Sequence, residues 1–235
     1  MELFKVLDLS RQDLSAICRQ ITIPLSHSFS LRQATLADIP RIVEVDKKSF
    51  GAEDLAMTEE MMTSRIKIFP EGNWVLQKEK EIVGVGCSML ISDDEDKITS
   101  WSELTGNGTI STHKPDGKAL LGINVSLLPD VHGFGSAFLN EFTHILVVGL
   151  KLKLAFGVGR LLGYKEFADK MSPQEFLCLC VAENNILPVS PVVSFLMRAG
   201  GKLIKLVPNY WPVDTDSLGY GVLMEWVNPY WRFLS

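Results

Sequence analysis

The feature that most constrains this sequence is a continuous apolar run that leads directly into two glycines. The run, ALLGINVSLLP, covers residues 119–129, and runs of this kind are typical of strands buried on both faces of a sheet. Gly133 and Gly135 follow it, and a helical pattern starts at once in GSAFLNEFTHILVVG. The sequence therefore predicts a central strand that passes through a short glycine loop into a helix.

The glycine loop has two interpretations on its residues alone. Glycines let a backbone approach a ligand closely, and the N-terminus of a helix adds partial positive charge, so the loop suits a phosphate or pyrophosphate. A tight turn that needs glycine for packing gives the same pattern. The nucleotide P-loop is excluded because no Gly-Lys-Ser/Thr follows. The dinucleotide fingerprint is excluded because its third glycine, and the acidic residue about 20 positions further on, are missing.

The segments on either side alternate between strand and helix patterns. Strands are expected at 29–35, 73–77, 81–91, 151–159, 202–210 and 220–227. Helices are expected at 36–50, 58–68, 171–184 and 191–201, and the first three have N-cap signals at Thr35, Thr58 and Ser172. Because strands and helices come in mixed order, the sequence predicts an α+β fold, an α/β sandwich with a partly antiparallel central sheet.

The first 28 residues fall outside this alternation. A short amphipathic pattern there ends at Pro24, so we expect residues 1–28 to form a linker or docking arm and residues 29–235 to form one domain. Of the 235 residues, 46% are hydrophobic, which is enough for a sizeable core and excludes a largely disordered chain. No apolar run reaches the roughly 18 residues of a membrane span, so no membrane association is expected.

Charge and cysteine content exclude several functions. The net charge of −5 gives no general attraction to nucleic acid or to anionic lipid. The first residues carry no export signal, and four cysteines make no disulfide framework in a chain of this length, so we expect a reducing, cytoplasmic environment. Cys178 and Cys180 have no histidine nearby, so we expect small buried residues there and predict no metal site.

The residues around the glycine loop carry a family resemblance. PDVHGFGSA, residues 129–137, resembles the pyrophosphate loop of the GCN5-related N-acetyltransferase (GNAT) superfamily: Pro, two residues, Arg or Gln, Gly, any residue, Gly, any residue, Gly or Ala. LRQATLADIPRIVEVDKKSF looks like the first strand and helix of that superfamily, and PVVSFLMRAGG is similar to its fourth helix. The resemblance covers about residues 29–228. It implies the GNAT fold, a mixed, mostly antiparallel sheet flanked by helices and splayed at the acyl-CoA site.

The C-terminal half resembles two branches of the superfamily. Segments 159–177 and 191–229 look like the GNAT-like domains of polyketide synthase loading modules and like GNAT domains fused to carbon-nitrogen hydrolases. Loading-type domains decarboxylate malonyl-CoA and pass the acetyl unit to the thiol of an acyl carrier protein. The resemblance thus implies an acyltransferase or decarboxylase that uses acetyl- or malonyl-CoA, with an acyl carrier protein or neighbouring synthase domains as partner. The alternative is a degenerate, non-catalytic GNAT-like domain that serves as a structural or docking module.

The resemblance also assigns residues to coenzyme A. Leu127 and Leu128 would offer backbone groups to the pantetheine arm, and the pyrophosphate would lie on His132, Gly133, Phe134, Gly135, Ser136 and Ala137. His132 replaces the usual Arg or Gln, and an imidazole still donates a hydrogen bond to phosphate. Leu196 stands where many members place a tyrosine that protonates the leaving thiolate, so transfer to a thiol is favoured over transfer to an amine.

Three polar residues are candidates for the chemistry itself. Asn124 and Ser126 lie on the central strand just before the loop. They either donate hydrogen bonds to the thioester carbonyl or are satisfied polar residues within the sheet. Lys165, where related sequences often show a histidine, is a candidate cation for a malonyl carboxylate. Thr112 and His113, in the long loop at 101–118, are secondary candidates.

Overall fold

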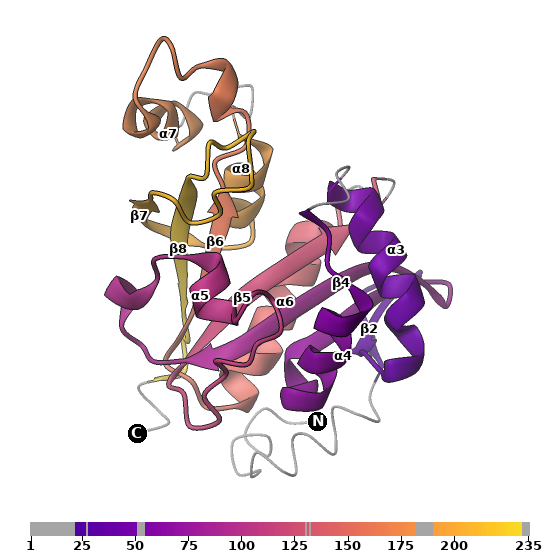
Figure 1. Ribbon diagram of the computed structural model, residues 1–235. Helices are drawn as coiled ribbons and strands as arrows, with labels where there is room; N and C mark the ends of the chain where they lie inside the picture. The colour runs from indigo at the N-terminus through magenta and orange to yellow at the C-terminus, as the bar shows by residue number, and fades with distance from the viewer. Residues whose placement is uncertain are drawn as a thin grey trace.

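The computed structural model describes residues 22–26, 28–50, 55–129, 131, 133–181 and 190–231. Their backbone forms an eight-stranded sheet with the order β1-β2-β3-β4-β5-β6-β8-β7 (Figure 1). All neighbouring strands are antiparallel except β5 and β6, which are parallel. The strands are β1 (Ile23–Pro24), β2 (Phe29–Gln33), β3 (Asn73–Lys78), β4 (Glu81–Ile91), β5 (Ala119–Leu127), β6 (Leu154–Arg160), β7 (Lys202–Val207) and β8 (Gly221–Val227). The predicted mixed, mostly antiparallel sheet is confirmed.

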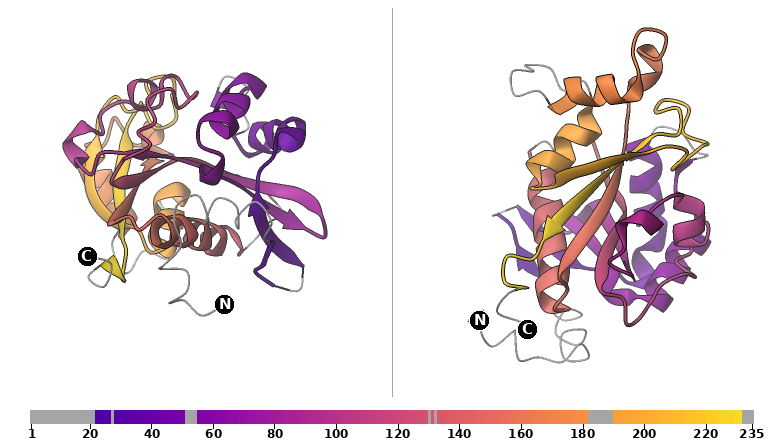
Figure 2. Two further views of the ribbon diagram at one scale, coloured as in Figure 1. Left: turned by 90° about the horizontal axis from the view of Figure 1, so that it is seen from below. Right: turned by 90° about the vertical axis from the view of Figure 1, so that its left-hand side faces the viewer.

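Helices cover both faces of the sheet (Figure 2). One face carries α3 (Ile39–Phe50), α4 (Glu59–Ile68) and the short α5 (Trp101–Thr105). The other carries α6 (Gly135–Gly149) and α8 (Pro191–Arg198), and α7 (Pro173–Val181) packs against α8. This arrangement is the expected α/β sandwich. No helix in the described part of the chain combines the length and the hydropathy that crossing a membrane requires.

Side-chain caps fix where the helices begin. Thr35 and Asp38 form a capping box in the turn that leads into α3. The Thr58 side chain accepts an N–H from the first turn of α4. Ser172 and Glu175 bond reciprocally at the start of α7, where each accepts the backbone N–H of the other. All three starts agree with the caps expected from the sequence.

The parallel pair β5–β6 is joined over only part of its length. Ala119–Gly122 of β5 pair with Leu154–Gly157 of β6, and both strands then continue without pairing to each other. Because β6 stays with β8 and β5 stays with β4, the two halves of the sheet part as a V (Figure 1). A β-bulge in β5 lies at the point of parting. Gly122 and Asn124 of β5 pair with consecutive residues of β4, which leaves Ile123 between them without a partner. The predicted splay of the sheet is confirmed.

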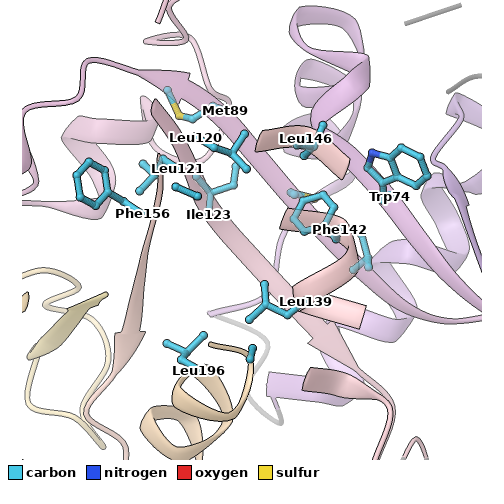
Figure 3. Packing of buried hydrophobic residues seen from close by; sticks show 14 of the residues in the cluster. Trp74, Met89, Leu120, Leu121, Ile123, Leu139, Phe142, Leu146, Phe156 and Leu196 are labelled. Carbon is cyan, nitrogen blue, oxygen red and sulfur yellow. The ribbon is translucent and has the colours of Figure 1, made fainter. Parts of the chain in front are cut away.

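The core holds both sides of this opening in place. Trp74 of β3, Met89 of β4 and Phe156 of β6 are buried, as are Phe142 and Leu146 of α6 (Figure 3). Close-packed interiors of this kind resist local displacement. The V is therefore a fixed feature of the fold.

Some boundaries differ from those expected. β1 pairs with β2, so the sheet begins within the segment expected to be an arm. The larger part of that arm, residues 1–21, lies outside the described residues, and the division at residue 28 stays a prediction. The strand expected at 202–210 ends at Val207, because Pro208 has no N–H to give to a ladder.

Candidate functional site

A cavity of about 660 Å³ lies where β5 and β6 part. It passes through the sheet, because its lining comes from both strands, from α6 and α8 on one face, and from α3, α4, α5 and residues 210–214 on the other. Gly122 lies at its narrow end. A Cβ at Gly122 would meet only the Phe156 carbonyl oxygen within 4 Å, at 3.7 Å. The missing side chain leaves the narrow end open to a ligand.

The wall formed by α6 and α8 is apolar. Leu139, Phe142, Phe195 and Leu196 line it, and Figure 3 shows the first two on α6 and the last on α8. Leu196 packs so closely on Gly159 that a Cβ there would lie 2.5 Å from the leucine Cδ1. The position at which the family resemblance places an acidic tyrosine thus borders the cavity and carries no proton donor.

The glycine loop lies at the N-terminus of α6, as the sequence predicts. α6 begins at Gly135, and no side chain caps it at the N-cap residue Phe134. Gly133 has a φ of +82°, and a Cβ there would meet no described atom within 4 Å, so its backbone is open to a ligand. A Cβ at Gly135 would lie 2.6 Å from Leu127 and 2.9 Å from Phe195. The ligand interpretation fits Gly133, and the packing interpretation fits Gly135.

The remaining loop residues support an anion site at the helix end. Ser136 and Ala137 lie in the first turn of α6, whose N–H groups have no partner within the helix. The Phe134 ring stacks on Phe29 with centroids 4.0 Å apart, which anchors the loop to β2. His132 lies outside the described residues.

The two leucines assigned to the pantetheine arm use their N–H groups differently. Leu128 donates to the Val83 carbonyl of β4 at 2.9 Å. Leu127 donates to Ser49 Oγ at 3.3 Å, and Ser49 lines the cavity from the end of α3. The Leu127 N–H is therefore directed toward the opening, while that of Leu128 belongs to the sheet. Their roles toward coenzyme A stay predictions.

Asn124 and Ser126 converge on a buried carboxylate that the sequence analysis missed. Asp46 of α3 is fully buried and accepts from Asn124 Nδ2 at 2.9 Å, from Ser126 Oγ, and from the Met57 N–H at 2.6 Å. Asn124 lines the cavity. The sequence does carry one signal for Asp46: it lies four residues after Ile42, so it falls on the apolar stripe of α3.

Two arginines, rather than Lys165, bring positive charge to the cavity. Lys165 is exposed and does not line it, whereas Arg65 and Arg160 do. Arg160 is bound to Asp214 through two nitrogens, Nε lying 2.6 Å from Oδ2. Burial raises the pKa of the Asp214 carboxyl, and the hydrogen bonds from Arg160 and Ser217 more than reverse this, so the net pKa is below its usual value.

Arg65 differs from Arg160 because it has no acidic partner among the described residues. Its side chain is 1% exposed, and its Nε–H donates to the Gly108 carbonyl at 2.8 Å. Its Nη1 lies 3.9 Å from Met57 Sδ. No carboxylate in the described part of the chain lies within ion-pair distance of it. A buried guanidinium at a cavity is suited to bind an anionic group.

An aromatic wall closes the face opposite α6 and α8. Trp101 and Trp211 contact each other with centroids 5.5 Å apart, and the guanidinium of Arg160 lies over the rings of Phe50 and Trp211. Tyr210 completes this wall, and burial raises the pKa of its phenol well above the usual value. The phenol therefore stays protonated at neutral pH.

The secondary candidates lie elsewhere. His113 Nδ1 accepts the Leu90 N–H at 3.1 Å, and Thr112 donates to the Leu104 carbonyl. Neither lines the cavity. Cys178 is exposed on α7, so the expectation that it is buried is wrong; the side chain of Cys180 is not described. Within the described residues, no group of three or more His, Cys, Asp or Glu side chains is arranged to hold a metal.

Comparisons with known proteins place the chain in a family, although no family model matches it. It is 30% identical over 215 residues to an uncharacterized N-acetyltransferase, YkwB of Bacillus subtilis strain 168, which covers 88% of this chain and 92% of that protein. It is 34% identical over 200 residues to a probable hydrolase, YhcX of the same organism. That match covers 84% of this chain but only 38% of the hydrolase.

Solved structures share the fold. A GphF GNAT-like decarboxylase in complex with isobutyryl-CoA superposes with a TM-score of 0.72 and 24% identity, over 84% of this chain and 98% of that one. The loading GNATL domain of CurA from Lyngbya majuscula gives a TM-score of 0.73 and 22% identity, over 86% and 98%. A sheet that parts at its parallel pair, beside a glycine loop that opens a helix, defines a GNAT-like acyltransferase fold. The chain belongs to the GCN5-related N-acetyltransferase superfamily.

Proposed function

We propose that the cavity is an acyl-CoA site and that the protein is an acyltransferase of the polyketide loading type. The observation that carries the proposal is the opening itself, about 660 Å³ of space between β5 and β6. The tryptophans of the neighbouring segments do not fill this opening. Trp74 is buried elsewhere, with its Nε1–H donated to the Glu71 carbonyl, and Trp101 forms part of the cavity wall. The pyrophosphate would lie on the open backbone at Gly133 and the first turn of α6.

The proposed reaction has two steps, decarboxylation and acetyl transfer. A malonyl thioester loses CO₂ and takes one proton at its α-carbon, which gives the acetyl thioester. The acetyl group then passes to the sulfur of a carrier thiol, and the thiol proton goes to the departing coenzyme A thiolate. Because one thioester replaces another, the transfer needs little free energy, and the absence of an acid at Leu196 is tolerated.

The described residues supply binding and exclusion of water. Arg65 would hold the malonyl carboxylate, since it is the cation of the cavity without an acidic partner among the described residues. Leu139 and Phe142 make the α6 side of the cavity, across the sheet from Arg65, apolar. Two solved structures with this fold support the proposal, because one is a GNAT-like decarboxylase in complex with isobutyryl-CoA and the other is a loading domain. A carrier protein or synthase domain as partner, and a cytoplasmic location, are part of this proposal.

Thermal unfolding with added ligand is the first test. Coenzyme A, acetyl-CoA and malonyl-CoA should each raise the melting temperature, because a ligand at 100 times its Kd stabilises the native state by about 2.7 kcal/mol. Mass spectrometry of malonyl-CoA and of an added carrier protein would then separate decarboxylation from transfer. No shift with any of the three thiols or thioesters would favour the alternative, a non-catalytic structural or docking module.

A pair of variants tests whether Arg65 binds the malonyl carboxylate. Arg65→Lys should weaken malonyl-CoA binding about tenfold relative to acetyl-CoA, because a lysine loses the bidentate contact. The matched control is Lys165→Ala, which removes an exposed cation that does not line the cavity. If Lys165→Ala, and not Arg65→Lys, changes the malonyl-to-acetyl preference, the carboxylate lies near Lys165.

A further inference from the structure

The network around Asp46 fixes the orientation of a cavity-lining amide. Asp46 is fully buried, and no basic side chain in the described part of the chain pairs with it. It receives three donors instead: Asn124 Nδ2, Ser126 Oγ and the Met57 N–H. With these three donors, both oxygens of Asp46 act as hydrogen-bond acceptors.

This carboxylate leaves Asn124 only one orientation. The amide end that faces Asp46 has to be the NH₂, because a carbonyl oxygen there would face another acceptor. The second hydrogen of Nδ2 is directed to Ser126 Oγ at 3.3 Å, and the Ser126 proton goes to Asp46. Both amide hydrogens are thus engaged within the wall. The atom left over is Asn124 Oδ1, to which no described residue donates.

We infer that Asn124 faces the cavity as a hydrogen-bond acceptor, held so by Asp46, and that it binds the proton of the incoming nucleophile. A thioester oxygen offers only lone pairs, so it gains nothing from Asn124 Oδ1, and negative charge that develops on it would be repelled. A thiol S–H or an amine N–H is the complementary group. This inference rests on the proposed function for the identity of the cavity, and it replaces the expected donor role of Asn124.

The position of Asn124 along the opening favours the nucleophile over the pantetheine amides. Asn124 lies two residues beyond Gly122, the last residue of β5 that pairs with β6. It is therefore at the narrow end, where the reacting thioester would lie. The pyrophosphate loop follows the far end of β5, so the pantetheine arm runs past Leu127. Asp46 is accordingly a positioning residue, one that acts through Asn124.

Asp46→Asn should reverse the amide. The new side chain has to keep its oxygen for the Met57 N–H, 2.6 Å from the present carboxylate, so its NH₂ faces Asn124. Asn124 then turns its oxygen inward and presents an N–H donor to the cavity. The substitution is nearly isosteric, so packing around α3 is retained. It changes the polarity offered to a nucleophile and leaves the shape of the wall unchanged.

The orientation can be tested without any assay of activity. In the protein labelled with ¹⁵N at asparagine, the Asn124 side-chain hydrogens should exchange with water at least about tenfold more slowly than those of the exposed Asn209, because both are hydrogen-bonded within the wall. Asn124→Ala assigns the signal by removing it. In Asp46→Asn the protection should be lost. Equal exchange for Asn124 and Asn209 in the unmodified protein would overturn the orientation, even if Asp46→Asn failed to fold.

Kinetics test what the oxygen binds. With malonyl-CoA and pantetheine as the thiol acceptor, Asn124→Ala and Asp46→Asn should raise the KM for pantetheine about three- to tenfold, the loss of one hydrogen bond, more than they lower kcat for decarboxylation. Asp96→Asn, which removes an exposed ion pair to Lys205, is the surface control. A fall in decarboxylation with unchanged pantetheine KM would overturn the inference and make Asn124 a donor to the enolate. Absence of coenzyme A binding would defeat the proposed function while the exchange result still decides the orientation.

Discussion

Replacing Asp214 by asparagine should destabilise the protein far more than replacing a surface acid whose pKa is also lowered. Asp214 is 1% exposed and is bound to Arg160 through two nitrogens and to Ser217 Oγ. The backbone of Asp214 also stabilises the turn at residues 214–219, since the Gly219 N–H donates to the Asp214 carbonyl at 3.0 Å. Asp214→Asn keeps the shape of the side chain and removes its charge.

The size of the effect follows from burial. Removing one partner of a buried ion pair typically costs about 3–5 kcal/mol, because the other charge is left uncompensated. Arg160 retains 18% exposure and can be hydrated through the cavity, so we expect about 2–3 kcal/mol. In a protein of this size each kcal/mol shifts the melting temperature by roughly 2–4 °C, which gives a loss of roughly 4–12 °C.

Glu44 provides the matched comparison. Hydrogen bonds from Lys48 and Arg41 lower the pKa of Glu44 to about 2, yet its side chain is 46% exposed. Glu44→Gln should leave the melting temperature unchanged within error, since solvent screens such pairs. A smaller loss for Asp214→Asn than for Glu44→Gln would refute the argument that burial, and not the lowered pKa, sets the cost.

The pH dependence supplies a second check with a defined sign. Because the folded pKa of Asp214 lies below its ordinary value of 3.8, its stabilising contribution is present above that pH and disappears as the pH falls through the folded pKa. Urea unfolding of both proteins should therefore give a large gap at pH 7 that narrows below about pH 4. A gap that stays constant down to pH 3 would mean that the charge of Asp214 is not what stabilises the loop.

Three further substitutions test the site. Gly135→Ala should cost about 1–3 kcal/mol in urea unfolding, because its Cβ would overlap Leu127 and Phe195, and an unchanged midpoint would show that α6 shifts freely. Gly122→Val should leave the melting temperature nearly unchanged but reduce kcat/KM for longer acyl-CoAs more than for acetyl-CoA; equal losses would place the acyl group elsewhere. Leu196→Tyr puts a phenol at the cavity and should raise acetylation of small amines by about 10²-fold, followed as coenzyme A release, whereas no gain would mean that amines do not reach the thioester.

Much of the fold could be predicted from the sequence because its signals are local. A continuous apolar run indicates the buried strand β5, and Gly133 and Gly135 mark the turn into α6. Capping residues such as Ser172 lie next to the helix starts that they define. The splay itself depends on where β5 and β6 stop pairing, and the family resemblance, not the residue pattern, indicated it.

The candidate site was predictable only in part, because its chemistry depends on contacts between distant segments. Asn124 and Ser126 could be identified as polar residues on a buried strand, but the direction of their donors is set by Asp46, 78 and 80 positions away. The positive charge of Lys165 makes it a candidate from the sequence, but the structure leaves it exposed on a 3-10 turn. Arg65 gave no sequence signal, because a single arginine within a helical segment is normally solvated.

Asp46 illustrates why an exception to a local rule can identify function. An acid on the apolar stripe of α3 loses its hydration on burial, and among the described residues three hydrogen bonds, rather than an ion pair, offset the cost. A chain under selection for stability alone would place an apolar residue there. The acid occurs here together with Asn124 and Ser126, the two polar residues of β5 that donate hydrogen bonds to it. Because the network gives Asn124 a single orientation at the cavity, we infer that its stability cost is retained for what it presents to a ligand.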